Sequence, residues 1–140
     1  SKPQSYVIRN DLSATVAGRN MIWTGAVIGS FLIYHLLHFT VQVTNPALAA
    51  ARNLDSLGRP DVFTMVVKSF QNFGIASVYL LSLTALWLHL SHGIQSSFQT
   101  WGLNSEKSLP IIKRAGAFAA VILFLAYIAV PVLIAAGIVK

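Results

Sequence analysis

Three long stretches of this sequence contain no residue with a formal charge. They hold 32, 37 and 25 residues and lie between Arg19 and Arg52, between Lys68 and Glu106, and between Arg114 and Lys140. A helix needs about 20 apolar residues to cross the hydrocarbon core of a bilayer, so each stretch can hold one crossing. The apolar runs are continuous and exceed the roughly 9–11 residues of a membrane strand, so we expect helices and no strands.

The sequence predicts an all-α membrane protein with one domain, residues 1–140. Its three transmembrane helices are expected to form an up-down-up bundle, at about residues 21–44, 70–98 and 113–139. Asn45 and Pro46 favour a turn after the first span, and Gly102 can end the second in a left-handed conformation. Helix is expected to resume before the second span with Asp61 as N-cap, and Pro131 is expected to kink the third span.

The composition excludes several classes of protein. Hydrophobic residues make up 55% of the chain and charged residues only 10%, against roughly 25% charged residues in an average soluble domain. Cysteine is absent, which removes disulfides, iron–sulfur ligation and covalent c-type haem attachment. The net charge of +6 is scattered through the polar segments, so anionic lipid headgroups or an acidic protein are expected partners and nucleic acid is not.

The basic residues favour one orientation in the membrane. The side of the N-terminus would hold six of the ten, which are Lys2, Arg9, Arg19, Lys107, Lys113 and Arg114. Because basic loops stay in the cytoplasm, the N-terminus and the loop 101–114 are expected on the cytoplasmic side. Trp23 and Trp101 would then anchor two spans at that interface.

All four histidines lie inside the predicted spans, as two H-x-x-H pairs: His35 with His38, and His89 with His92. The spans contain no Asp or Glu, which excludes carboxylate-bridged metal sites and carboxylate proton relays within them. An imidazole in hydrocarbon is costly without a partner, so each histidine is a candidate functional residue. Interhelical hydrogen bonding can explain any one of them but is a strained explanation for all four. Neutral imidazole also binds haem iron, and two imidazoles on one iron suit electron transfer.

Spacing along the helix favours His89 as a ligand. Gly93 lies four residues further on, on nearly the same face, and leaves room for a flat macrocycle. His92 is interpreted as a neighbour that reaches a propionate, a quinone or a backbone carbonyl. Spacing alone does not rank His35 above His38. Zinc or copper is a weaker interpretation of H-x-x-H, because no cysteine or acid lies near to complete the ligand set.

Three pieces of the chain resemble a known family. The first span has W-T-G followed by F-L-I-Y-H-L-L-H-F-T, the second has L-H-L-S-H-G-I-Q-S-S-F-Q-T-W-G-L, and the chain ends I-A-V-P-V-L-I-A-A-G-I-V-K. They resemble the membrane cytochrome b subunit of succinate:quinone oxidoreductases and fumarate reductases, in the class whose five-helix anchor carries two b haems. The chain corresponds to the C-terminal three-helix part of such an anchor.

The resemblance implies axial haem ligands at His35 and His89, each on a different haem. The opposite imidazoles would come from two further helices or from another chain. Counted from the same side, His35 lies about 14 residues into its span and His89 about 9, a difference in depth near ~7 Å. A single haem held by both therefore stays open as an alternative. The fumarate reductase branch carries an acid beside the second ligand, where this chain has Leu88 and Leu90.

The function implied by the resemblance is electron transfer between an iron–sulfur subunit and a membrane quinone, with menaquinone favoured. The chain would belong to succinate dehydrogenase (complex II) or fumarate reductase in a bacterial cytoplasmic membrane, and a flavoprotein subunit would carry out the dicarboxylate chemistry. Candidate contacts to quinone or propionate are Ser91, Gln95 and Trp101. The alternatives are a b-type cytochrome of another respiratory complex, such as a hydrogenase or formate dehydrogenase, and a transporter or assembly factor whose histidines bind a transition metal or relay protons.

Overall fold

The computed structural model describes residues 20–103 and 105–140, and the secondary structure in these two ranges consists of helices without strands. The elements in chain order are α2 (Met21–His35), the π-helical turn η1 (Leu36–Thr40), the 3₁₀ turn η2 (Ala50–Arg52), α3 (Val62–Gln71), α4 (Phe73–Thr100) and α5 (Leu109–Ala135). Three helical segments are long and apolar enough to cross a membrane, namely Met21–Thr40, Phe73–Thr100 and Leu109–Ala135. The expected all-helical fold with three such helices is confirmed.

Two N-caps divide the middle of the chain into separate helices. Asp61 caps α3 as predicted, since its carboxylate accepts a hydrogen bond from the backbone N–H of Thr64 at 2.9 Å. Asn72 caps α4, because its side-chain oxygen accepts from the N–H groups of Gly74 at 2.9 Å and Ile75 at 3.2 Å. Asparagine is among the strongest N-cap residues, so the long apolar helix begins at Phe73, a few residues after the predicted start of the span.

Backbone conformation sets the other helix ends. The first helical segment stops at Thr40, and Gln42 has a left-handed φ of 60°, so this segment is shorter than the predicted range 21–44. Gly102 follows α4 with a φ of 69°, the left-handed ending that the sequence predicted. Helix α5 begins at Leu109 with a proline in its first turn and contains Pro131.

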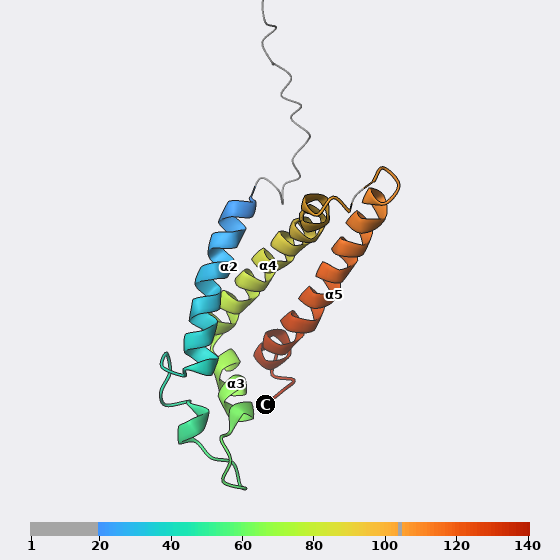
Figure 1. Cartoon of the computed structure of the whole chain (residues 1–140). Coiled ribbons are helices and arrows are strands. Elements are labelled where there is room, and N and C mark those ends of the chain that lie inside the picture. The colour runs from blue at the N-terminus through green and yellow to red at the C-terminus, as the bar shows by residue number, and fades with distance from the viewer. Residues whose placement is uncertain (1–19, 104) are drawn as a thin grey trace, which may run out of the picture.

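Helix α4 packs lengthwise against α2 and against α5 (Figure 1). The contact with α5 is tight at Gly116, where an added Cβ would stand 3.0 Å from Cγ2 of Ile94. A residue without a side chain lets the two backbones approach closely, as at many membrane helix interfaces. Helix α3 lies at one end of the three long helices and contacts α4 and α5 there (Figure 1).

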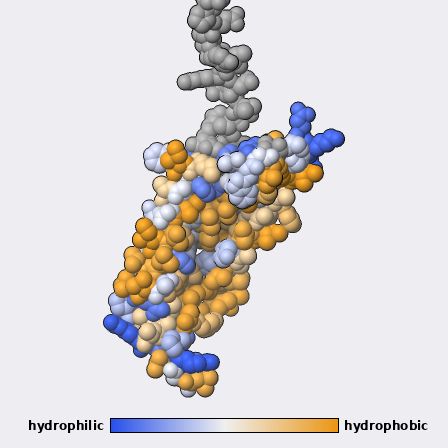
Figure 2. All heavy atoms as spheres, viewed as in Figure 1, coloured by the Kyte–Doolittle hydropathy of each residue, from blue (hydrophilic) through white to orange (hydrophobic). Residues whose placement is uncertain are grey.

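The surface of the three long helices is mostly apolar. Figure 2 shows hydrophobic side chains along their sides and hydrophilic ones mainly toward the two ends. Large apolar side chains such as Ile33, Leu81 and Leu125 are exposed, as expected where lipid takes the place of water. The buried apolar cluster lies at the α3 end and consists of Val67, Phe70, Ala76, Tyr79 and Ile134. Three basic residues used above for the orientation, Lys2, Arg9 and Arg19, lie outside the described residues.

Candidate functional site

The histidines lie at two levels along the bundle. At one level, His35 in α2 and His38 in η1 both face Tyr79 of α4. At the other level, His89 of α4 contacts Thr24 in the first turn of α2. Tyr79 and His89 are ten residues apart on α4, and Thr24 and His35 are eleven residues apart on α2. These counts correspond to about 15–17 Å along the helix axis.

This separation decides whether His35 and His89 can bind the same iron. A metal–imidazole bond is about 2 Å long, so the two axial nitrogens of one iron lie about 4 Å apart. His35 and His89 therefore lie at two separate levels of the bundle, each beside its own hydroxyl residue. The depth difference predicted from the sequence was too small because α4 extends beyond the start of α2. His89 stands eleven residues before the end of α4, whereas its partner Thr24 stands only three residues after the start of α2.

The Thr24 hydroxyl is the hydrogen-bond partner of Nδ1 of His89. The Thr24 oxygen lies 3.1 Å from Nδ1 of His89, 3.0 Å from the carbonyl oxygen of Asn20 and 3.1 Å from that of Met21. A hydroxyl has one proton and a carbonyl can only accept, so a Thr24 hydroxyl that donates to one of these carbonyls accepts Nδ1–H of His89 at its oxygen. The neutral imidazole then has its lone pair on Nε2, which is the form that binds a metal.

Two glycines leave space beside His89. An added Cβ at Gly25 would stand 3.4 Å from Cε1 of His89, at the short edge of an ordinary contact, so the imidazole lies close against α2. An added Cβ at Gly93 would meet only Cε of Met21 at 3.6 Å, which is an ordinary contact, so packing within the chain does not require a glycine there. His89 and Gly93 both line a cavity of about 440 Å³ between the start of α2 and the end of α4.

Of the other residues predicted near His89, only some line the cavity beside it. Trp101 lines the same cavity. The hydroxyl of Ser91 donates to the backbone carbonyl of Leu88 at 2.9 Å, so it is already bonded within its own helix. His92 and Gln95 are partly exposed on α4 and are not among the residues that line the cavity.

At the other level the hydroxyl of Tyr79 lies between two imidazoles. It is 2.9 Å from Nδ1 of His38 and 3.4 Å from Nδ1 of His35. His38 is only 4% exposed and stacks on Phe39 with ring centroids 4.1 Å apart. Nε2 of His38 is buried and has no hydrogen-bond partner within the part of the chain that the structure describes.

His35 and His38 differ in what they face. His35 lines an apolar cavity of about 440 Å³ to which η1, α3, α4 and α5 also contribute side chains. Aromatic rings such as Phe31, Phe39 and Tyr127 form part of its wall, and His38 does not line it. Spacing in the sequence did not rank these two histidines, whereas the structure places only His35 at a space that can receive a large apolar ligand.

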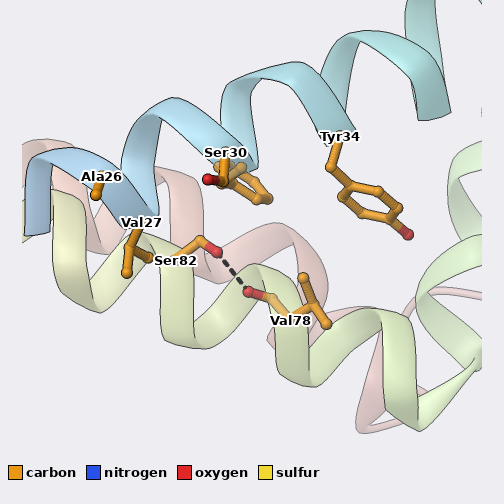
Figure 3. A pocket seen from close by; sticks show the side chains of 7 residues that line it. Ala26, Val27, Ser30, Tyr34, Val78 and Ser82 are labelled. Atoms are coloured by element: carbon orange, nitrogen blue, oxygen red, sulfur yellow. Dashed lines mark hydrogen bonds between the residues drawn. The ribbon is translucent and has the colours of Figure 1, made fainter. Parts of the chain in front are cut away.

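A third hollow of about 440 Å³ lies between α2 and α4 (Figure 3). Figure 3 shows the hydroxyl of Ser82 donating to the backbone carbonyl of Val78, at 2.8 Å. Its lining residues are Ala26, Val27, Ser30, Phe31, Tyr34, Val78 and Ser82. No imidazole lines this hollow, so it offers no histidine ligand for haem iron.

The described residues contain no group of three or more His, Cys, Asp or Glu side chains that could hold a metal ion. A zinc or copper site built on one H-x-x-H pair would therefore have two ligands from these residues, short of the three or four that such sites use. The aspartates in the described ranges, Asp55 and Asp61, bind neighbouring residues in the segment before α4. The backbone N–H and guanidinium of Arg59 hold the pKa of the Asp55 carboxyl below its usual value, and hydrogen bonds from Thr64 lower the pKa of Asp61.

Sequence reasoning missed the two hydroxyl residues that hold the imidazoles, Thr24 and Tyr79. The available signal was that each is a polar side chain inside an apolar span. No protein-family model, curated protein sequence or solved structure matches this chain. A proposal about its function therefore depends on the geometry of the histidines and on the motifs that contain them.

Proposed function

We propose that this chain is a haem b-carrying membrane anchor, or the three-helix part of one, in a succinate:quinone oxidoreductase or fumarate reductase. Helices α2, α4 and α5 are the up-down-up bundle of this anchor. One observation carries the proposal: His35 and His89 each line a cavity of about 440 Å³, and each has a hydroxyl group at Nδ1. The two cavities belong to levels about 15 Å apart, as two separate haems require.

The residues at each level fit a haem with bis-imidazole ligation. A ligating histidine almost always uses its second nitrogen to bond a neighbouring group, which fixes the orientation of the ring. Thr24 serves His89 in this way, and Tyr79 lies within reach of His35. Each level offers one imidazole at its cavity, so the opposite ligand comes from another segment. This agrees with the five-helix anchor that the motifs resemble.

The bound haems supply one-electron oxidation and reduction. The side chains of this chain fix the orientation of the imidazole rings and exclude water from the two cavities. His89 and His35 would bind the iron through Nε2, and Gly93 keeps the wall of the first cavity open. Aromatic and aliphatic side chains line the second cavity, and such apolar surroundings are one of the means by which a protein tunes a haem.

The rest of the reaction takes place outside this chain. A flavoprotein subunit oxidises succinate or reduces fumarate, an iron–sulfur subunit passes the electrons on, and a membrane quinone, menaquinone in our proposal, exchanges them at the anchor. The N-terminus and the loop 101–114 face the cytoplasm, where the soluble subunits dock. His89, at the level of the α2 start, then lies closer to the iron–sulfur subunit than His35 does.

Haem counting in the purified complex tests the proposal. We expect two b haems in the wild-type complex, one in His89→Ala and one in His35→Ala, as measured by the pyridine haemochrome spectrum. His92→Ala is the matched control, because it removes an imidazole from the same helix that does not line the cavity. A wild-type complex without haem, or full haem content in both alanine variants, would contradict the proposal.

A second measurement separates this function from that of other b-type cytochromes. Succinate added to membranes that contain the complex should reduce the haems and then a quinone. Haem reduction by hydrogen or formate but not by succinate would assign the chain to a different respiratory complex.

A further inference from the structure

Tyr79 contacts two imidazoles through one hydroxyl group, at 2.9 Å from Nδ1 of His38 and 3.4 Å from Nδ1 of His35. A phenol has a single proton to donate, and each neutral imidazole has one N–H and one lone pair. If both contacts are hydrogen bonds, Tyr79 donates to one histidine and accepts from the other. The two histidines are therefore in opposite tautomers, and only one of them carries its lone pair on Nε2.

The contact lengths and the adjoining cavity favour one direction of this chain of hydrogen bonds. His35 lines the apolar cavity, whereas His38 is 4% exposed and is covered by the ring of Phe39. The shorter contact, 2.9 Å, joins Tyr79 to His38, which suits the donation of the more acidic phenolic proton to an imidazole lone pair. Nδ1–H of His35 then donates to the Tyr79 oxygen, and Nε2 of His35 has the free lone pair.

We infer that Tyr79 is the positioning residue for His35, and that it acts only because His38 takes its proton. This inference rests on the proposed function, since it concerns the nitrogen of His35 that meets a haem iron. His38 has no ligand role in this arrangement. It holds the Tyr79 hydroxyl in the orientation that leaves the tyrosine oxygen available to accept from His35.

The prediction that distinguishes this arrangement from simple packing concerns His38. In His38→Ala the Tyr79 hydroxyl loses its acceptor and turns its proton toward Nδ1 of His35. The His35 ring then carries its own proton on Nε2, the nitrogen that must be free to bind iron. In His38→Gln the side-chain amide oxygen can accept the tyrosine proton, so the original direction is kept.

The experiment compares six forms of the whole membrane complex: wild type, Tyr79→Phe, Tyr34→Phe, His38→Ala, His38→Gln and the double variant Tyr79→Phe/His38→Ala. Tyr34 is the matched control, because its ring lies 5.4 Å from that of His38 and its hydroxyl makes no hydrogen bond to either imidazole. The readouts are haem content, the redox midpoint of the haem that is lost in His35→Ala, and its low-temperature paramagnetic resonance spectrum.

We expect Tyr79→Phe to favour reduction of that haem by about three- to tenfold, because the ligand loses a neutral hydrogen bond that makes it more basic. His38→Ala should have a lower content of the same haem, and His38→Gln should restore it. Introducing Tyr79→Phe into His38→Ala should restore part of the haem, since it removes the proton that blocks His35. Such non-additivity is the signature of residues that act through one another.

Three results would overturn the inference while leaving the proposed function intact. In the first, Tyr79→Phe has the same midpoint potential and resonance spectrum as Tyr34→Phe. In the second, His38→Gln loses as much haem as His38→Ala. In the third, the effects of Tyr79→Phe and His38→Ala on haem content are strictly additive in the double variant. A wild-type complex that contains no haem has a different meaning, because it refutes the proposed function itself and the inference with it.

Discussion

Replacing Thr24 with valine tests whether this hydroxyl acts on His89 as a haem ligand, the role that we propose for it. Valine has nearly the shape of threonine, so the change removes the 3.1 Å contact with Nδ1 of His89 and little else near the imidazole. An imidazole whose N–H is hydrogen-bonded is a more basic ligand and favours oxidised iron. We therefore expect the haem of His89 to stay bound in Thr24→Val, with a more positive midpoint potential.

The size of the shift follows from the strength of one neutral hydrogen bond. Such a bond contributes about 0.5–1.5 kcal/mol. For a one-electron couple, a tenfold change in the equilibrium is about 59 mV and about 1.4 kcal/mol. Complete loss of the bond to Thr24 thus corresponds to a positive shift of roughly 20–65 mV. Redox titration of the purified complex, followed at the reduced haem band, resolves a change of this size.

Thr84→Val on α4 is the matched control for this substitution. The Thr84 hydroxyl donates to the carbonyl of Leu80 at 2.9 Å, the same kind of bond within a helix that Thr24 makes with Asn20 at 3.0 Å, and it contacts no imidazole. We expect Thr84→Val to keep the wild-type potentials. Equal potentials in both variants and in the wild type, with the His89 haem present, would show that Thr24 has no effect on the ligand.

Three further predictions concern packing and charge. Gly93→Leu should remove the haem of His89, because a long side chain fills the cavity that Gly93 lines. Gly93→Ala should keep this haem, because an added methyl group meets only Cε of Met21 at 3.6 Å. Equal haem contents in the two variants would contradict this prediction. Gly116→Val should destabilise the contact between α4 and α5 by about 1–3 kcal/mol, because even an added Cβ would stand 3.0 Å from Cγ2 of Ile94. An unchanged melting temperature of the variant in detergent would contradict this prediction. The pKa of Asp61 is lowered in the folded chain, so its support of α3 is complete above the ordinary carboxyl pKa and is lost as the pH falls through the lowered value. Asp61→Asn keeps a good N-cap and should remove this dependence, as amide hydrogen exchange of α3 across that pH range will show.

The membrane helices could be predicted from the sequence because an unpaired charge is costly in hydrocarbon. The three uncharged stretches each contain one long apolar helix. Local capping was predictable at Asp61 and Gly102, where one residue type suffices to end or begin a helix. The break at Asn72 was missed because the run of apolar residues continues on both sides of it, although Gly74 follows two residues later.

The candidate site could be predicted only in part. The four histidines stood out because imidazole is rare in apolar spans, and Gly93 stood out because of its spacing from His89. The levels of the histidines could not be predicted, because they depend on how far α4 extends beyond the start of α2. The partners Thr24 and Tyr79 lie 65 and 44 residues from their histidines, so only the packing of α2 on α4 brings them together.

The choice of hydroxyl partners has a physical consequence for the imidazoles. A carboxylate would be the stronger partner for a ligand N–H, but the spans contain no Asp or Glu, and an acid in hydrocarbon costs several kcal/mol. Threonine and tyrosine orient the ring without introducing a charge and pull less strongly on its proton. An imidazole held in this way donates less electron density than one paired with a carboxylate, so its iron is easier to reduce. In the proposed anchor, both haems should therefore have higher midpoint potentials than a haem whose histidines bond carboxylates.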